Sequence, residues 1–190
     1  SPPMEPIRTD PKLGPLVETH GELPIGTADD EFERLVVAIV NQQLSVESAA
    51  AIRERLFDRV DVTPTGVRAV DDATLRDVGL SGQKIDYVRN VADAFEERDL
   101  TREGLANASD EDVVDLLTDI RGVGVWTGKM YLIYVLGRPD VFPVEDLGVR
   151  KGMAELYGFD EDDRDGMVGH AARWEPYRSY ASRYLWRVVD

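Results

Sequence analysis

The chain has 190 residues, 43% of them hydrophobic, which is enough for one sizeable core or two small lobes. It contains no cysteine, which excludes disulfides, zinc–thiolate sites and iron–sulfur clusters, and no apolar run reaches the about 18 residues of a membrane-spanning helix. The net charge of −15 should repel nucleic acid in ordinary buffers.

The N-terminal stretch lacks the basic-then-apolar pattern of a signal peptide, and the first 27 residues are predicted to form an extended arm. After them, apolar residues recur at helical spacing and no segment alternates like a strand. Three serines have the side chains and positions of helix N-caps: Ser45, Ser81 and Ser109. Asp29 and Asp30 could cap a further helix that begins just before Phe32. Helices are also predicted near 73–78, 125–136, 146–157, 161–171 and 175–189.

These patterns predict an all-α fold of roughly eight to ten short helices. Residues 28–190 would form the helical domain, as two small lobes flanking a cleft. The expected lobes cover about 28–118 and 119–190, with the N-terminal arm packing on the second.

A glycine turn, Gly122-Val123-Gly124, separates two of the predicted helices. Glycine lets a backbone approach another molecule closely, and the N–H groups that begin the next helix suit a phosphate. Such a turn alone usually only joins helices. Here the flanking residues also follow the pattern h-x-x-h-x-G-h-G-x-x-T-[AG] of the helix–hairpin–helix DNA-binding motif, through Leu117, Ile120, Val125, Thr127 and Gly128.

Four segments, spread over about residues 28–188, together resemble the helix–hairpin–helix (HhH-GPD) DNA glycosylases, and most closely the 3-methyladenine DNA glycosylase II type. The segments are 41–45 (NQQLS), 122–128 (GVGVWTG), 140–143 (DVFP) with Asp146, and 174–180 (WEPYRSY) with Trp186. The part before residue 28 is too short for the β-rich N-terminal domain of some relatives, so the compact form is expected.

The resemblance implies that Asp146 is catalytic. Its carboxylate would stabilise the oxocarbenium-like sugar and orient or deprotonate the attacking water. From the residues alone, without the glycine turn upstream, Asp146 would be interpreted as a helix N-cap, because a helical segment follows it. Trp126 stands where backbone-cutting relatives carry a Schiff-base lysine, which predicts a monofunctional enzyme without lyase activity.

The resemblance also implies a base pocket of Trp126, Met130, Leu147 and Trp186. A tryptophan face attracts a cationic alkylated purine by about 0.5–2 kcal/mol. Tryptophans on helices are also often simply core residues.

Gln42, Gln43 and Leu44 lie between two predicted helices, and the resemblance implies that this turn fills the gap left by a flipped nucleotide. Gln43 aligns with the leucine of relatives and Leu44 is adjacent, so either is a candidate wedge; an ordinary polar turn is the alternative. The remaining residues expected at the DNA are Gly122, Val123, Gly124, Thr127 and Lys129.

No cofactor is expected to be required. The resemblance allows for a structural Na⁺ or K⁺ on the backbone carbonyls of Thr118, Ile120 and Val123. His20 and His170 fit no metal motif, and Arg178 is predicted to bridge helices rather than touch DNA.

We therefore predict a base excision repair enzyme that flips 3-methyladenine-like purines out of double-stranded DNA and hydrolyses the N-glycosidic bond, leaving an abasic site. The alternatives are a mismatch uracil or thymine glycosylase that uses the same aspartate, and a helix–hairpin–helix binding module without catalysis. A monomeric, cytoplasmic, nucleoid-associated prokaryotic protein without membrane contact is expected.

The acidic composition needs an explanation in a DNA-binding protein. Only four residues are lysines (Lys12, Lys84, Lys129 and Lys151). We hypothesise adaptation to high internal salt, as in a halophilic archaeon, because the Debye length falls to about 3 Å at about 1 M salt. Basic residues still outnumber acidic ones, five to three, over 120–151.

Overall fold

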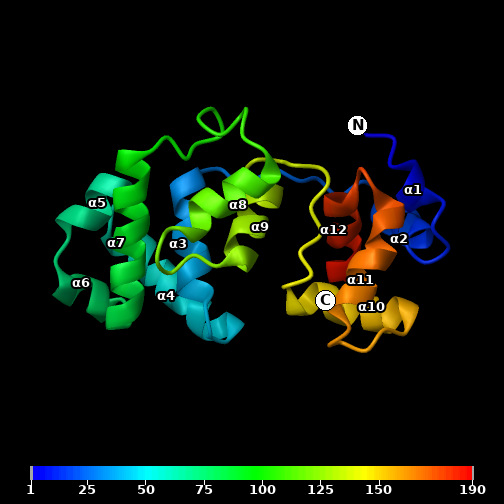
Figure 1. Ribbon diagram of the computed structural model, residues 1–190. Coiled ribbons are helices and arrows are strands. Elements are labelled where there is room, and N and C mark those ends of the chain that lie inside the picture. The colour runs from blue at the N-terminus through cyan, green and yellow to red at the C-terminus, as the bar shows by residue number, and fades with distance from the viewer. Residues whose placement is uncertain (1, 190) are drawn as a thin grey trace. The chain divides into compact units, whose positions relative to one another are not determined.

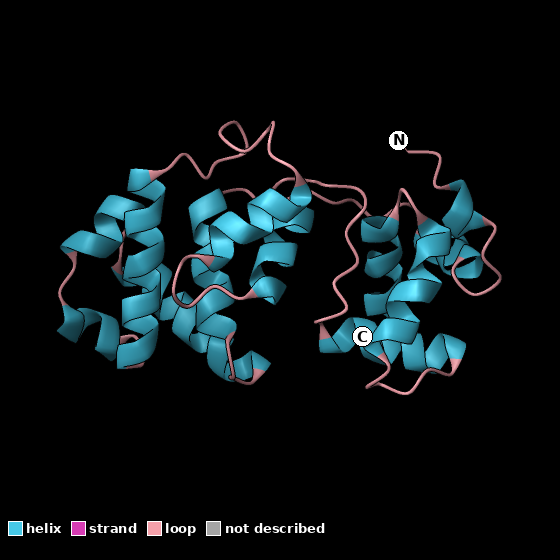
Figure 2. Ribbon diagram, in the orientation of Figure 1, coloured by secondary structure: helices cyan, strands magenta, loops and turns pink. Residues whose placement is uncertain are grey.

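The computed structural model describes residues 2–189, and throughout this range the regular structure is helical, without a strand (Figure 2). The all-α prediction is confirmed. The helices in chain order are α1 (Glu5–Arg8), α2 (Gly14–His20), α3 (Glu31–Asn41), α4 (Val46–Arg59), α5 (Pro64–Ala69), α6 (Asp72–Asp77), α7 (Gly82–Glu97), α8 (Asp110–Thr118), α9 (Val125–Tyr134), α10 (Leu147–Tyr157), α11 (Arg164–Ala171), the 3₁₀ helix η1 (Ala172–Trp174) and α12 (Arg178–Val189) (Figure 1). Within the described residues this exceeds the eight to ten helices expected.

The chain forms two units, one of residues 28–131 and one that joins the first 27 residues to those from 132 onward. We expected the boundary near residue 118, just before the glycine turn. The glycine turn instead lies inside the unit of residues 28–131, together with α8 and the first residues of α9. A Cβ on Gly128 would lie at an ordinary van der Waals distance, 3.6 Å, from Val114 of α8.

The N-terminal segment is helical, where an extended arm was expected. Helices α1 and α2 bury four apolar side chains in the core of the second unit: Met4, Ile7, Leu13 and Val17. Both helices have a proline in their first turn. N–H groups in the first turn make no hydrogen bond within the helix, so the missing N–H of proline costs nothing there. The prolines therefore begin helices here instead of excluding them.

In the unit of residues 28–131, α7 packs against α3 and α5, and α3 against α4 (Figure 1). Four of the predicted caps, Asp30, Ser45, Ser81 and Ser109, each accept a hydrogen bond from the backbone amide three residues on, so these helix starts are confirmed. Of the two aspartates offered for α3, Asp30 is the cap. Helix α5 was not predicted. It begins with Thr63 as the N-cap and Pro64 behind it.

In the second unit, α10 packs on α12. Gly152 allows this approach, because a Cβ there would lie 2.6 Å from the carbonyl oxygen of Leu185. The two helices enclose a core with the N-terminal residues and with Phe142, Val149, Met153, Trp174, Tyr184 and Leu185. This crossing brings residue 146 and residue 186 together, although 40 positions separate them in sequence.

None of the helices in residues 2–189 has the length and apolar character needed to cross a membrane.

Candidate active site

Asp146 lies at the start of α10 in the second unit. Its Oδ2 accepts a hydrogen bond from the backbone amide of Val149 at 2.9 Å, so the N-cap interpretation of this residue is confirmed. The turn before it is also fixed, because Arg150 donates to the carbonyl of Val144 at 2.9 Å.

The indole of Trp186 binds the same carboxylate oxygen. Its Nε1 donates to Asp146 Oδ2 at 2.6 Å, a short charge-assisted hydrogen bond. Gly148 permits this contact, since a Cβ there would lie 3.0 Å from Trp186 Cδ1 and 3.1 Å from Asp146 Oδ2. Two donors on different helices therefore hold one carboxylate oxygen in a fixed direction.

Trp186 is also supported on one face. The ring of Tyr134 stacks on it at 5.8 Å between centroids and 25° between planes. The guanidinium carbon of Arg183 lies 5.8 Å from the centre of the Tyr134 ring. The Trp186 ring is thus held in place by Tyr134 and is only partly buried. Leu147, beside Asp146, is 50% exposed.

The glycine turn in the other unit is tight. Gly122 has φ of 108°, which disfavours any other residue, and the amide of Val123 donates to the Ile120 carbonyl at 3.0 Å. Gly124, at the start of α9, is exposed, and a Cβ there would meet nothing within 4 Å. The backbone of the turn is therefore open on the side where α9 begins.

Of the candidate site side chains in and after the glycine turn, some are buried and others are partly exposed. Val123, Thr127 and Met130 are all at least 95% buried, so contacts of the first two with DNA would have to use the backbone. Trp126 and Lys129 are partly exposed. Trp126 and Met130 belong to the unit of residues 28–131, and Asp146, Leu147 and Trp186 to the other.

The turn of Gln42, Gln43 and Leu44, here called the wedge turn, follows α3. Gln43 has φ of 57°, a left-handed conformation that is uncommon for a residue other than glycine and that occurs often at functional turns. Leu44 is 40% exposed. The side-chain Nε2 of Gln42 donates to the Gly122 carbonyl at 3.0 Å, so the wedge turn and the glycine turn are in direct contact.

Arg178 is part of the scaffold, as predicted. It forms a bidentate ion pair with Asp140, with Nε to Oδ1 at 2.8 Å and Nη2 to Oδ2 at 3.1 Å, which connects the loop before Asp146 to α12. His170 lies among aromatic rings, 4.3 Å from that of Tyr157. In residues 2–189 no three or more His, Cys, Asp or Glu side chains gather in a way that could hold a metal ion.

The model of one protein family, described as the HhH-GPD superfamily of base excision DNA repair proteins, matches residues 36–176. The chain belongs to this superfamily. The matched range includes the wedge turn, the glycine turn and Asp146, so the resemblance inferred from the sequence is confirmed.

Individual HhH-GPD relatives are similar over most of the chain. The Bacillus subtilis protein YfjP is 30% identical over 188 residues, which are 94% of this chain and 66% of that protein. DNA-3-methyladenine glycosylase 1 of Schizosaccharomyces pombe is 33% identical, over 84% of this chain and 72% of its own length.

Two solved HhH-GPD structures share the fold. The DNA-3-methyladenine glycosidase of Bacillus halodurans has a TM-score of 0.85 at 34% identity, covering 99% of this chain and 89% of that one. The 3-methyladenine DNA glycosylase of Schizosaccharomyces pombe in complex with abasic DNA also has a TM-score of 0.85, at 30% identity, over 97% and 94%.

The structure adds residues to the HhH-GPD site that the sequence reading missed. Tyr134 braces Trp186, and Gly148 admits the indole to Asp146. A glycine in the first turn of a helix costs up to about 1 kcal/mol relative to alanine, and this unfavourable choice was the available signal for Gly148. Nothing in the local pattern marks Tyr134.

Proposed function

We propose that this protein is a monofunctional DNA glycosylase of base excision repair that hydrolyses the N-glycosidic bond of alkylated purines in duplex DNA. The observation that carries the proposal is the Asp146 carboxylate, held by the Val149 amide and the Trp186 indole. A fixed negative charge of this kind is what the cleavage of a glycosidic bond needs, because positive charge develops on the sugar.

Asp146 would act on the sugar and on water. As the bond to the base lengthens, its carboxylate stabilises the oxocarbenium-like sugar, and it then orients or deprotonates the water that attacks C1′. The base leaves with the electron pair of the bond. An alkylated purine already carries a positive charge, so it leaves with little assistance from an acid.

The substrate class rests on the aromatic residues and on the relatives. Trp186, braced by Tyr134 and partly exposed, and the partly exposed Trp126 each present an electron-rich ring of the kind that attracts a flat cationic base. Relatives in the superfamily carry names of 3-methyladenine glycosylases. Trp126 stands at the position of the lyase lysine, so water is the proposed nucleophile and the DNA strand stays intact.

The unit of residues 28–131 would hold the DNA. The open backbone of Gly124 at the start of α9 would receive a phosphate, and the wedge turn would fill the gap left by the flipped nucleotide. We include a monovalent cation on the carbonyls of Thr118, Ile120 and Val123 in this proposal. A carbonyl oxygen has two acceptor positions, so that of Ile120 can accept from Val123 and still bind a cation. We also propose that the protein acts as a monomer.

The test is release of free base from methylated duplex DNA by the wild type and by Asp146→Asn. The matched control is Asp163→Asn. Asp163 is also an N-cap, accepting from Gly166 at 3.0 Å, but it is exposed at the start of α11. Asparagine caps a helix as well as aspartate does, so both variants should fold normally.

We expect Asp146→Asn to lower release at least about a hundredfold, with Asp163→Asn unchanged. The strands should remain uncut until alkali is added. No base release by the wild type would contradict the enzyme proposal, and undiminished release by Asp146→Asn would contradict the assignment of the carboxylate. Release of uracil with methylated purines untouched would replace the substrate class by the mismatch alternative.

A further inference from the structure

Helix α7 contacts both turns that the proposed function assigns to DNA. Three of its residues, spaced three apart, make the contacts: Lys84, Tyr87 and Asn90. Positions three apart on a helix lie close to one another on its surface, so one side of α7 carries all three. The wedge turn meets the first of these residues and the glycine turn meets the other two.

Lys84 holds the wedge turn by its backbone. Its Nζ donates to the carbonyl of Val40 at 2.8 Å and to that of Gln42 at 2.6 Å. These are carbonyls at the C-terminal end of α3, where the helix dipole favours a positive charge. Partial burial of the ammonium lowers the pKa of Lys84, which reflects the cost of taking it out of water.

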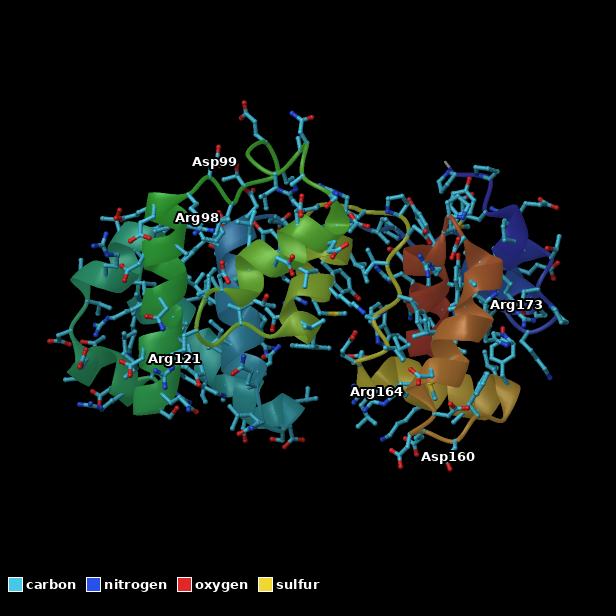
Figure 3. All side chains as sticks on the ribbon, in the orientation of Figure 1. Arg98, Asp99, Arg121, Asp160, Arg164 and Arg173 are labelled. Carbon is cyan, nitrogen blue, oxygen red and sulfur yellow. The ribbon has the colours of Figure 1, made fainter. Side chains whose placement is uncertain are left out.

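Tyr87 and Asn90 hold the glycine turn. The Tyr87 ring packs on Gly122 so closely that a Cβ there would lie 2.3 Å from its Cγ. The side-chain Nδ2 of Asn90 donates to the backbone carbonyl of Arg121 at 3.2 Å; Figure 3 labels Arg121 beside α7. The Gln42–Gly122 hydrogen bond closes the arrangement, so the two turns are fixed both to α7 and to each other.

We propose that Lys84, Tyr87 and Asn90 are positioning residues that set the distance between the wedge turn and the glycine turn. The glycine turn would grip the DNA backbone, and the wedge then enters the duplex at a fixed step from the gripped phosphate. This inference rests on the proposed function. It concerns extrusion of the base and not cleavage of the glycosidic bond, which is assigned to Asp146 in the other unit.

The two steps can be separated by the choice of substrate. A normally paired lesion must be pulled out of its pair and stack, whereas a lesion opposite a stable abasic analogue has no pair to break and is extruded at lower cost. Lys84→Met removes the ammonium and keeps the length of the side chain. The matched control is Lys12→Met, which makes the same change in net charge at an exposed lysine of the other unit.

Single-turnover release of one methylated purine is measured from both duplexes, with the melting temperature of each variant as a check of folding. We expect Lys84→Met to slow release about tenfold from the paired duplex and less than about threefold from the unpaired one. Lys84→Arg, which keeps a cation able to donate to both carbonyls, should restore most of the rate. Fluorescence of 2-aminopurine beside the lesion should show slower extrusion in Lys84→Met alone.

Equal losses on the two duplexes, or no loss on the paired one, would overturn the inference. Failure of Lys84→Arg to restore the rate at a wild-type melting temperature would overturn it too. If Lys84→Met does not fold, Asn90→Ala serves for the same comparison, because it removes only a partly exposed amide. Base release by the wild type is a separate result, and its absence would refute the proposed function. If Lys84→Met has the same ratio of rates on the paired and unpaired duplexes as the wild type, only the positioning role is refuted.

Discussion

Gly148→Ala should separate activity from stability. The new Cβ would lie 3.0 Å from Trp186 Cδ1 and 3.1 Å from Asp146 Oδ2, so the indole and the carboxylate must each move by a few tenths of an ångström. Their hydrogen bond, now 2.6 Å, is of the charge-assisted kind, whose contribution is about 1.5–3 kcal/mol. Loss of about half of that, roughly 0.8–1.5 kcal/mol, slows the reaction about three- to tenfold. Alanine is meanwhile better than glycine in a helix by up to about 1 kcal/mol.

The assay is single-turnover base release beside thermal unfolding, with Gly169→Ala as the control. Gly169 lies in α11 of the same unit, and a Cβ there would meet nothing within 4 Å. We expect Gly169→Ala to be fully active and slightly more stable. Gly148→Ala should be about three- to tenfold slower at a melting temperature close to that of the wild type, because the weakened hydrogen bond offsets the gain in helix propensity. Wild-type rates in Gly148→Ala would refute the argument that the indole must approach this carboxylate so closely.

Three further outcomes are expected. Gly122→Ala forces a side chain into φ of 108° and against Tyr87, so it should destabilise the unit of residues 28–131 by about 1–3 kcal/mol and weaken duplex binding; unchanged melting and affinity would contradict the hairpin assignment. Burial alone would raise the pKa of Asp10, but hydrogen bonds from Trp174, the Lys12 amide and Tyr157 outweigh it and leave that pKa below its ordinary value. The free energy of unfolding should therefore fall as the pH drops below about 4, through the folded-state pKa of this group. Asp10→Asn should be less stable at neutral pH and show a smaller fall, and parallel pH profiles would count against this. Finally, base release should persist at about 1 M salt, where repulsion by the net charge is screened; activity confined to low salt would contradict the halophilic hypothesis.

The helix starts could be predicted where a short polar side chain caps the backbone. Asp30, Ser45, Ser81 and Ser109 each do so in the structure. The three helices that were missed, α1, α2 and α5, each have a proline in the first turn. We expected extended chain at the N-terminus, but a proline at the start of a helix loses no hydrogen bond and is compatible with the helices found there. Tertiary burial of Met4 and Ile7 decided between the two conformations.

The candidate site could be predicted only where its residues belong to local sequence patterns. Asp146 and the glycine turn belong to local patterns, so their positions on helix ends followed from the sequence. The Trp186–Asp146 hydrogen bond depends on α10 crossing α12 at Gly152, and the contact of Lys84 with Val40 and Gln42 joins residues more than forty positions apart. Packing of this kind leaves only weak local signals, such as a glycine in a helix.

The interleaving of the two units along the chain has a consequence for synthesis. The unit of residues 28–131 is one continuous segment, whereas the other unit needs both the first 27 residues and those from 132 onward. Units generally fold in the order in which the ribosome makes them. The unit that carries both turns should therefore fold first. Asp146 gains its hydrogen bond from Trp186 only after α12 has been synthesised. A growing chain would acquire its hold on DNA before its ability to cut a base from it, and catalysis would begin only with the last helix.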